Sequence, residues 1–118
     1  MGLAVRRSAI QQSPDVVRGF LKAMVAGLKL SIEQPDISKR AIGKYLASKD
    51  QEIIDEAYKS FAQLFPRVPY VTDDAIRAAL AVTDHPKAAA ANPKDFYDNR
   101  FLQELESSGF VKALNAGK

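Results

Sequence analysis

The sequence predicts a mostly or wholly α-helical fold, an irregular bundle of about five helices in which residues 1–118 form a single domain. Beyond residue 12 every apolar run repeats at three- and four-residue spacing, which is typical of helices, and alternating strand patterns are absent. Prolines mark the joints between these runs, and no repeat or low-complexity linker divides the chain. Short connections between helices of unequal length favour an irregular bundle over a symmetric one.

The segment from Ser13 to Gln34 is the helix around which the others are expected to pack. Ser13 is placed to cap the first turn, Pro14 suits the first helical position, and Asp15 complements the positive end of the helix dipole. Apolar side chains occupy more than half of its circumference, which predicts cover on more than one side. These side chains are Val16, Val17, Phe20, Leu21, Ala23, Met24, Val25, Leu28, Leu30 and Ile32.

Two more helices are expected in the middle of the chain. Asp36 is the predicted cap of a second helix, which ends near Ser48. Asp50 is the predicted cap of a third helix, which Pro66 ends. The apolar face of the second consists of Ile37, Ala41, Ile42, Tyr45 and Leu46, and that of the third of Ile53, Ile54, Ala57, Tyr58, Phe61, Leu64 and Phe65.

The ends of the chain are less regular. Residues 3–5 are compatible with a short strand or an extended arm, and residues 8–12 with a turn of helix. Residues 66–71 hold two prolines and are expected to form an extended connection, after which Thr72 opens a fourth helix that stops before His85. The alanine-rich residues 87–91 have nothing large to bury, so they are interpreted as a loop.

The last helix is expected from Asn99 to Ser108, with Asp98 as its cap, after one short turn that Asn92 and Pro93 begin. Gly109 is expected to end it in the left-handed conformation. The chain after this glycine then folds back over the helix, bringing Phe110 and Leu114 against Phe101, Leu102 and Leu105.

Composition excludes several kinds of site. The chain has no cysteine, which rules out disulfides, thiolate metal sites and cysteine nucleophiles. No apolar run approaches the roughly 20 residues that span a bilayer. The first residues, Met1 to Arg7, place their charges after a very short apolar piece, which is not the pattern of a signal peptide.

The net charge of +3 is unevenly distributed, with nine Lys or Arg against three acids in residues 1–49 and eight against eleven in residues 50–118. A basic half is typical of proteins that bind nucleic acid or anionic membranes. Here the basic residues are spread singly, and the two aromatics of that half, Phe20 and Tyr45, occupy core-like positions where they are unavailable for stacking. No nucleic-acid partner is therefore expected.

No constellation of catalytic or metal-binding residues is visible. The single histidine, His85, has no marked base, nucleophile or metal partner and is interpreted as a surface residue at a helix exit. Ser107-Ser108-Gly109 lacks the preceding strand that a nucleophile elbow requires. The acidic pairs lie in first helical turns, where compensation of the helix dipole explains them. They are Glu52 with Asp55 or Glu56, and Asp73 with Asp74.

Four other features were candidates for binding. Tyr58, Tyr70 and Tyr97 each have apolar neighbours and are interpreted as half-buried packing aromatics. The pair Arg6-Arg7 is the one candidate anion contact, although such pairs more often solubilise the end of a chain. The sequence therefore predicts no catalytic residue, no metal and no cofactor, and it identifies no ligand-binding residue.

Read as a whole, the order and spacing of several segments resemble the carboxyl-terminal part of the substrate-binding protein of an ABC importer. The group concerned serves the uptake of nitrate, sulfonates, taurine and thiamine precursors. The resemblance covers nearly all of the chain and rests on no single motif. The segments that carry it are Val5-Arg6-Arg7-Ser8, Gln12 to Arg18, Phe20 to Ala23, Asp50 to Tyr58, Val68 to Thr72 with Ile76, Asp95 to Leu102, and Leu105 to Phe110.

This resemblance implies a role in solute uptake, with an ABC permease and a small solute as partners and a periplasmic location. A chain without a signal peptide would be cytoplasmic if it were the complete gene product. In the family that the chain resembles, two α/β lobes hold the ligand between them like a clamp. The loops that contact the ligand come mostly from the earlier two thirds of the chain. By itself the present chain is therefore expected to bind no solute and to be no enzyme.

Two other interpretations remain open. The first is a stand-alone helical interaction module. The second is an enzyme related to the pyrimidine synthase of thiamine biosynthesis, which shares the clamp fold. The enzyme is the least favoured, because its chemistry draws on histidine and cysteine residues that this chain does not have.

The resemblance also implies that part of the apolar surface of residues 13–34 and 50–65 lies against a sheet that this chain does not contain. Burying even a few hundred Å² of such surface is worth several kcal/mol at about 25 cal/mol per Å². We therefore expect either a homodimer through these helices or a compact monomer whose helices close over the patch, with the homodimer preferred.

Overall fold

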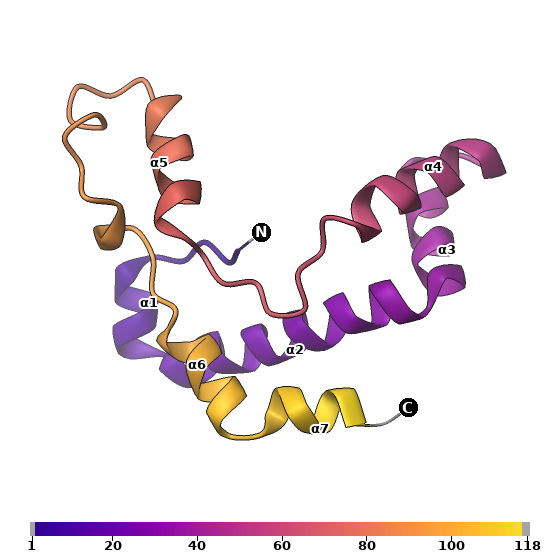
Figure 1. Cartoon of the computed structure of the whole chain (residues 1–118), viewed down its shortest axis with the longest axis horizontal. Helices are drawn as coiled ribbons and strands as arrows, with labels where there is room; N and C mark the ends of the chain where they lie inside the picture. Colours follow the sequence, from indigo (N-terminus) through magenta and orange to yellow (C-terminus); the bar gives the residue numbers. More distant parts are fainter. Residues whose placement is uncertain (1, 117–118) are drawn as a thin grey trace.

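The chain folds into helices that begin and end close to the prolines and capping residues of the sequence. In the computed structural model, which describes residues 2–116, that range holds seven α-helices, one 3₁₀ turn and no strand (Figure 1). The mostly α-helical prediction is confirmed. In chain order the elements are α1 (Arg7–Gln12), α2 (Pro14–Glu33), α3 (Pro35–Tyr45), α4 (Gln51–Ala62), α5 (Asp73–Ala81), η1 (Pro93–Asp95), α6 (Arg100–Ser107) and α7 (Phe110–Ala116). The first and last helices are additional to the five expected.

Three of the predicted caps are confirmed by hydrogen bonds from free backbone amides. Asp50 Oδ1 accepts from the amides of Glu52 at 2.9 Å and Ile53 at 3.4 Å, which starts α4. Thr72 Oγ1 accepts from an amide of the first turn of α5 at 3.2 Å. Asn92 Oδ1 accepts from the amide of Lys94 at 3.2 Å, which starts η1.

The predictions for Ser13 and Asp36 as side-chain caps are wrong, for a shared physical reason. Ser13 ends α1 as well as preceding α2, and its own amide donates to the Ala9 carbonyl at 2.9 Å, so its conformation is fixed by the earlier helix. Gln34 likewise ends α2 and precedes α3, which leaves Asp36 inside the first turn of α3. Helices joined by one residue leave no independent capping residue.

The last helix begins one residue later than predicted. Asn99 occupies the capping position of α6 and makes no side-chain cap, while Asp98 lies just outside and accepts from the amide of Arg100 at 3.0 Å. The glycine after the helix behaves as predicted, because Gly109 has a φ of 80°, which favours a residue without a Cβ.

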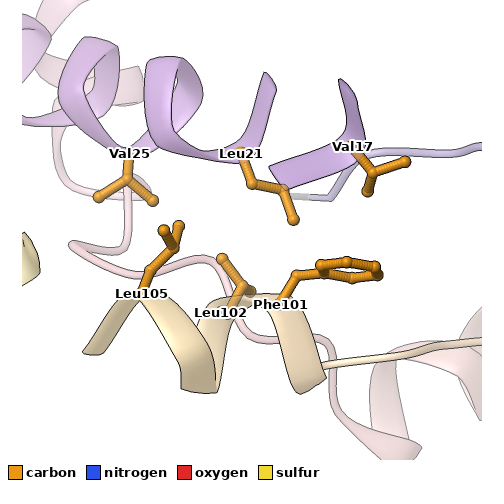
Figure 2. Packing of buried hydrophobic residues seen from close by; sticks show 6 residues of the cluster. All are labelled: Val17, Leu21, Val25, Phe101, Leu102 and Leu105. Carbon is orange, nitrogen blue, oxygen red and sulfur yellow. The ribbon is translucent and has the colours of Figure 1, made fainter. Parts of the chain in front are cut away.

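The core lies where α6 crosses the first half of α2, and Figure 2 shows the two sets of side chains pointing toward one another. The predicted return of the chain over this core is confirmed, because Phe110, Val111 and Leu114 of α7 pack against it. Leu3 of the amino-terminal arm and Val68 of the connection between α4 and α5 cover it further. The six buried residues of the cluster are Val17, Leu21, Val25, Phe101, Leu102 and Leu105.

The α3–α4 hairpin extends from the far end of α2 and has little cover (Figure 1). Ile54 is its one buried residue in the described chain, and it lies so close to Gly43 that a Cβ there would be 3.0 Å from its Cδ1. Tyr58 Oη donates to the Ile32 carbonyl at 3.1 Å, and Lys39 Nζ lies 2.9 Å from Asp55 Oδ1. These polar contacts tie the hairpin to itself and to α2.

Much of the predicted apolar surface of α3 and α4 is exposed, and these predictions of buried faces are wrong. The exposed side chains are Ile37, Tyr45, Leu46, Ile53, Phe61 and Leu64. Tyr45, at 87% exposed, and Phe20, at 54%, also contradict the prediction that both lie in the core. The expectation that no nucleic acid binds therefore rests on the spacing of the basic residues alone.

The overall shape is open. The radius of gyration is 17.0 Å, whereas a compact domain of this length has a value of about 13.5 Å. The accessible surface is 8703 Å², more than about 2,000 Å² above the roughly 6,300 Å² typical of a monomer of this mass. The alternative of a compact monomer closed over its apolar patch is therefore wrong. No helix in residues 2–116 is both long and apolar enough to cross a membrane.

Candidate functional site

A groove of about 980 Å³ lies beside the core. The amino-terminal arm, the exposed edge of the core on α2, and residues 69–71 form three of its sides. Residues 94–102, which run from η1 into α6, form the fourth, and α5 contributes Ala75 and Ile76. The groove is therefore built by segments that are distant in the sequence and meet around α6.

Asn99 fixes one wall of this groove. Its Nδ2 donates to the Val71 carbonyl at 2.8 Å, and its Oδ1 accepts from the Val71 amide at 3.1 Å. The side-chain amide thus pairs with both backbone groups of one residue, as a neighbouring strand would. This clasp holds the extended connection against the start of α6.

Two tyrosines hold the same connection at its ends. Tyr97 Oη donates to Asp73 Oδ1 at 2.6 Å, and Tyr70 Oη donates to Glu106 Oε2. Each bond stabilises the neutral phenol beside a carboxylate, so the pKa of Tyr97 is raised and that of Tyr70 is raised to about 12. Both phenols are therefore protonated near neutral pH and are poor bases and nucleophiles there.

Three charged side chains of the groove, those of Arg7, Asp98 and Arg100, also have partners within the chain. Arg100 donates to both carboxylate oxygens of Asp98, with the shortest bond at 2.7 Å. The bond to Arg100 lowers the pKa of Asp98, and the same bond raises the pKa of Arg100. Arg7 Nη2 donates to the Asp95 carbonyl at 3.3 Å, which connects α1 to η1. The predicted anion contact at Arg6-Arg7 is thus partly occupied by the protein itself.

Taken together, the polar groups of the groove bind the chain to itself. Residues 94–102 form one side of the groove and make hydrogen bonds to the backbone. Phe96 and Phe101 give this side its apolar surface. Within residues 2–116 there is no cluster of three or more His, Cys, Asp or Glu that could hold a metal ion. The arrangement can hold segments of the chain in position, which is a structural role.

The other candidates from the sequence lie apart from this groove. His85 Nδ1 accepts from the Lys87 amide at 3.2 Å and closes a turn beyond α5. The hydroxyls of Ser107 and Ser108 donate to carbonyls of the last turn of α6, at 3.2 Å and 3.0 Å. Tyr58 is half-buried in the α3–α4 hairpin, with Lys39 Nζ 5.7 Å from its ring centre.

The acidic pairs are split among different partners. Asp55 pairs with Lys39 across the hairpin, whereas Glu56 pairs with Lys59 at 2.7 Å along α4. Asp73 accepts from Tyr97 and Asp74 does not, although Arg77 lies 3.8 Å from Asp73 and 4.0 Å from Asp74. The one partner in the described chain that two of these carboxylates share is therefore an arginine of the same helix.

Sequence reasoning missed the clasp made by Asn99 and the exposure of the helix faces. The sequence predicts Asn99 only as the first residue of the last helix, because its partner in the clasp, Val71, lies 28 residues away. The exposed apolar residues had a signal in the sequence, the apolar circumference of residues 13–34, but the sequence does not tell which side another helix covers.

Comparisons with known protein families, with curated proteins and with solved structures find no match to this chain.

Proposed function

We propose that this chain serves solute uptake as the carboxyl-terminal helical portion of the substrate-binding protein of an ABC importer. In this role it binds no solute alone and is not an enzyme. It supports the two α/β lobes of the clamp and belongs with them in the periplasm, beside an ABC permease.

The observation that carries the proposal is the surplus of accessible surface. The chain has more than about 2,000 Å² beyond a compact monomer of its mass, and several of its exposed side chains are large and apolar. Surfaces of this size and character mark contacts with other protein. The family resemblance names the lobes of the clamp as that protein.

The α3–α4 hairpin supports the same role. Ile53, Phe61 and Leu64 are exposed on α4, although their spacing is that of a buried helix face. The hairpin has one buried apolar side chain of its own, so its stability depends on cover from outside. A layer of helix against sheet supplies such cover in α/β proteins.

The groove beside α6 supports a structural role in preference to a catalytic one. Its two tyrosines, Asp98 and Arg100 are paired within the chain, so few polar groups are left to converge on a ligand. Ligand contacts in a clamp come from both lobes, and this chain would contribute the frame that positions them.

A stand-alone helical interaction module is the alternative that the same exposed faces favour. The two roles differ in the partner, which is the pair of clamp lobes in the first role and another protein in the second. The enzyme related to the pyrimidine synthase stays the least favoured, because the described groove contains neither histidine nor cysteine.

The genomic neighbourhood tests the proposal most cheaply. We expect coding sequence for two α/β lobes next to this chain, with permease and ATPase genes beside it. Joining or co-expressing the lobes with the chain is expected to give calorimetric binding of nitrate, a sulfonate or a thiamine precursor, whereas the 118-residue chain alone gives none. Micromolar binding by the chain alone, or a neighbourhood without transporter genes, would contradict the proposal.

A further inference from the structure

One face of α2 is apolar, regular and uncovered. Its exposed residues repeat at alternating intervals of four and three along the helix, the spacing of a coiled-coil seam. At 100° per residue this face lies about 140° round the helix from the buried residues that meet α6. We call it the α2 stripe, and its members are Val16, Phe20, Ala23, Gly27 and Leu30.

The α2 stripe is exposed despite its apolar character. Val16 is 71% exposed and Phe20 is 54% exposed, and a Cβ added at Gly27 would meet no atom within 4 Å. The stripe is flanked by small residues, including Gly19 and Ala26. A second helix could therefore approach its backbone closely without displacing a long side chain.

The charges of α2 lie on the other side of the helix and have partners there. Arg18 pairs with Asp15 and, at 3.0 Å, with Glu104 of α6. Lys22 Nζ lies over the ring of Phe110, 5.6 Å from its centre, and Lys29 pairs with Glu33 at 2.8 Å. Covering the stripe therefore buries no unpaired charge, which is the main cost of a helix interface.

The size of the uncovered surface fits a second copy of this chain. A standard stable interface buries about 800 Å² on each partner. The surplus surface of the whole chain, of which the α2 stripe is one part, is more than twice that amount. Because the stripe carries no charge, it has no electrostatic feature that would select a different partner. Another copy presents the same apolar seam at the same spacing.

The order of large and small residues determines how two stripes fit. In an antiparallel pair, Phe20 of one copy lies over Ala23 of the other, and Val16 lies over Gly27, so that large side chains fill the space above small ones. In a parallel pair, Phe20 meets Phe20 and Gly27 meets Gly27, which crowds one end and leaves a void at the other. The antiparallel arrangement avoids this crowding and this void at four of the five positions, and Leu30 lies beside the start of the partner's α2.

We propose that the α2 stripe is a homodimer interface in which the α2 helices of two copies pair antiparallel. The inference and the proposed function both draw on the surplus of accessible surface, but the inference concerns the α2 stripe, whereas the proposed function concerns the α3–α4 hairpin. Failure to dimerise would leave the transporter assignment standing, and a failed genomic test would leave the dimer standing.

Sedimentation equilibrium of the 118-residue chain and two variants tests the interface. We expect a dimer for the natural chain, and a dissociation constant raised at least about 30-fold in Phe20→Glu, as for loss of a hot-spot side chain. Gly27→Glu is the second variant, because glutamate favours a helix more than glycine does and therefore does not threaten folding. Val82→Glu, at a residue 86% exposed beyond α5, is the matched control and stays dimeric.

Circular dichroism shows whether each variant keeps its helices. Monomeric Phe20→Glu and Gly27→Glu with unchanged helix content would support the interface. A natural chain that stays monomeric at high concentration would overturn it, whether or not it binds a hydrophobic dye. Dimers that persist in both variants would also overturn it, because they would place the interface elsewhere.

Disulfide cross-linking tests the orientation, because the natural chain has no cysteine. One chain carries Val16→Cys and another carries Gly27→Cys. We expect oxidation of an equimolar mixture to join the two different chains, whereas Gly27→Cys alone gives little cross-linked product. Rapid cross-linking of Gly27→Cys with itself would overturn the antiparallel pairing.

Discussion

The two ends of α2 differ in how they are covered. Near its start, Val17, Leu21 and Val25 meet three buried side chains of α6, and α7 closes over them. Near its end, Leu28 of α2 and Ile54 of the α3–α4 hairpin are the buried apolar side chains, and the hairpin is tied mainly by polar contacts of Lys39 and Tyr58. The sequence of α4 nevertheless has apolar residues at helical spacing, as that of α6 does.

The difference shows that an apolar helix face has to be covered, but that its sequence does not identify the segment or the protein that covers it. Residues 99–114 return along the chain to the start of α2 and supply it there. No later segment of the described chain returns to α4 in the same way, as the open arrangement of the helices in Figure 1 shows. The hairpin therefore depends on protein outside this chain, whereas the α2–α6 core does not.

Truncating the centre of the core should have the largest effect. Leu105 is 1% exposed, and Leu105→Ala is expected to lower the free energy of unfolding by about 2–5 kcal/mol because a cavity remains. Leu64→Ala is the matched control in the hairpin, where the side chain is 74% exposed, and should change it by less than about 0.5 kcal/mol. Urea denaturation measures both. Equal losses would contradict the division into covered and uncovered regions.

Ile54→Ala should act on the hairpin alone. It removes the one buried apolar side chain of α3 and α4 in the described chain, at a local cost of about 2–4 kcal/mol. Hydrogen exchange is expected to show lost protection in α3 and α4 and little change in α6. Ile53→Ala, on the exposed side of the same helix, serves as control. Loss of protection throughout the chain would mean that the two regions unfold together.

Asn99→Ala should loosen the connection that links the two regions. The variant removes both hydrogen bonds to Val71 and leaves part-buried backbone groups without them, at an expected cost of about 1–3 kcal/mol. Gln103→Ala, at an exposed position of α6, is the control. Unchanged denaturation midpoints in both variants would show that the clasp contributes nothing.

The pH dependence should be the smallest effect. The carboxylate of Glu106 raises the pKa of Tyr70 from 10.0 to about 12, so the stabilising bond is fully present below pH 10 and is lost as the pH rises toward 12. Because Tyr70 is exposed, we expect a decline below about 1 kcal/mol in this window. The pKa of Tyr97 is also raised, so the variant Tyr70→Phe is used to isolate the contribution of Tyr70. A decline just as steep in that variant would exclude the bond as its cause.

Local signals in the sequence were sufficient for α2 to α6 and for several of their ends. Asp50, Thr72 and Gly109 act over a few residues, so their roles as caps or helix stops are predictable from neighbouring positions. The failures at Ser13 and Asp36 arose because adjoining helices share one residue. The conformation of a residue that joins two helices depends on both of them, whereas a capping rule considers only one helix end at a time.

The side of each helix that is covered was not predictable in the same way. Phe20 and Leu21 are consecutive and similarly apolar, yet Leu21 is buried and Phe20 is exposed because α6 approaches from one side. The candidate groove shows the same limit, since the Asn99 clasp joins residues 28 positions apart. Contacts between distant segments depend on the topology, which periodicity does not specify.

Native-state hydrogen exchange of the natural chain tests the central claim most directly. The account predicts that amides in the first half of α2 and in α6 exchange slowly and together, because they share the closed core. Amides of α3, α4 and α5 are predicted to exchange at least about 100-fold faster, because few buried apolar contacts hold those helices. Protection in α4 equal to that in α6 would contradict the claim that the hairpin depends on cover from outside the chain.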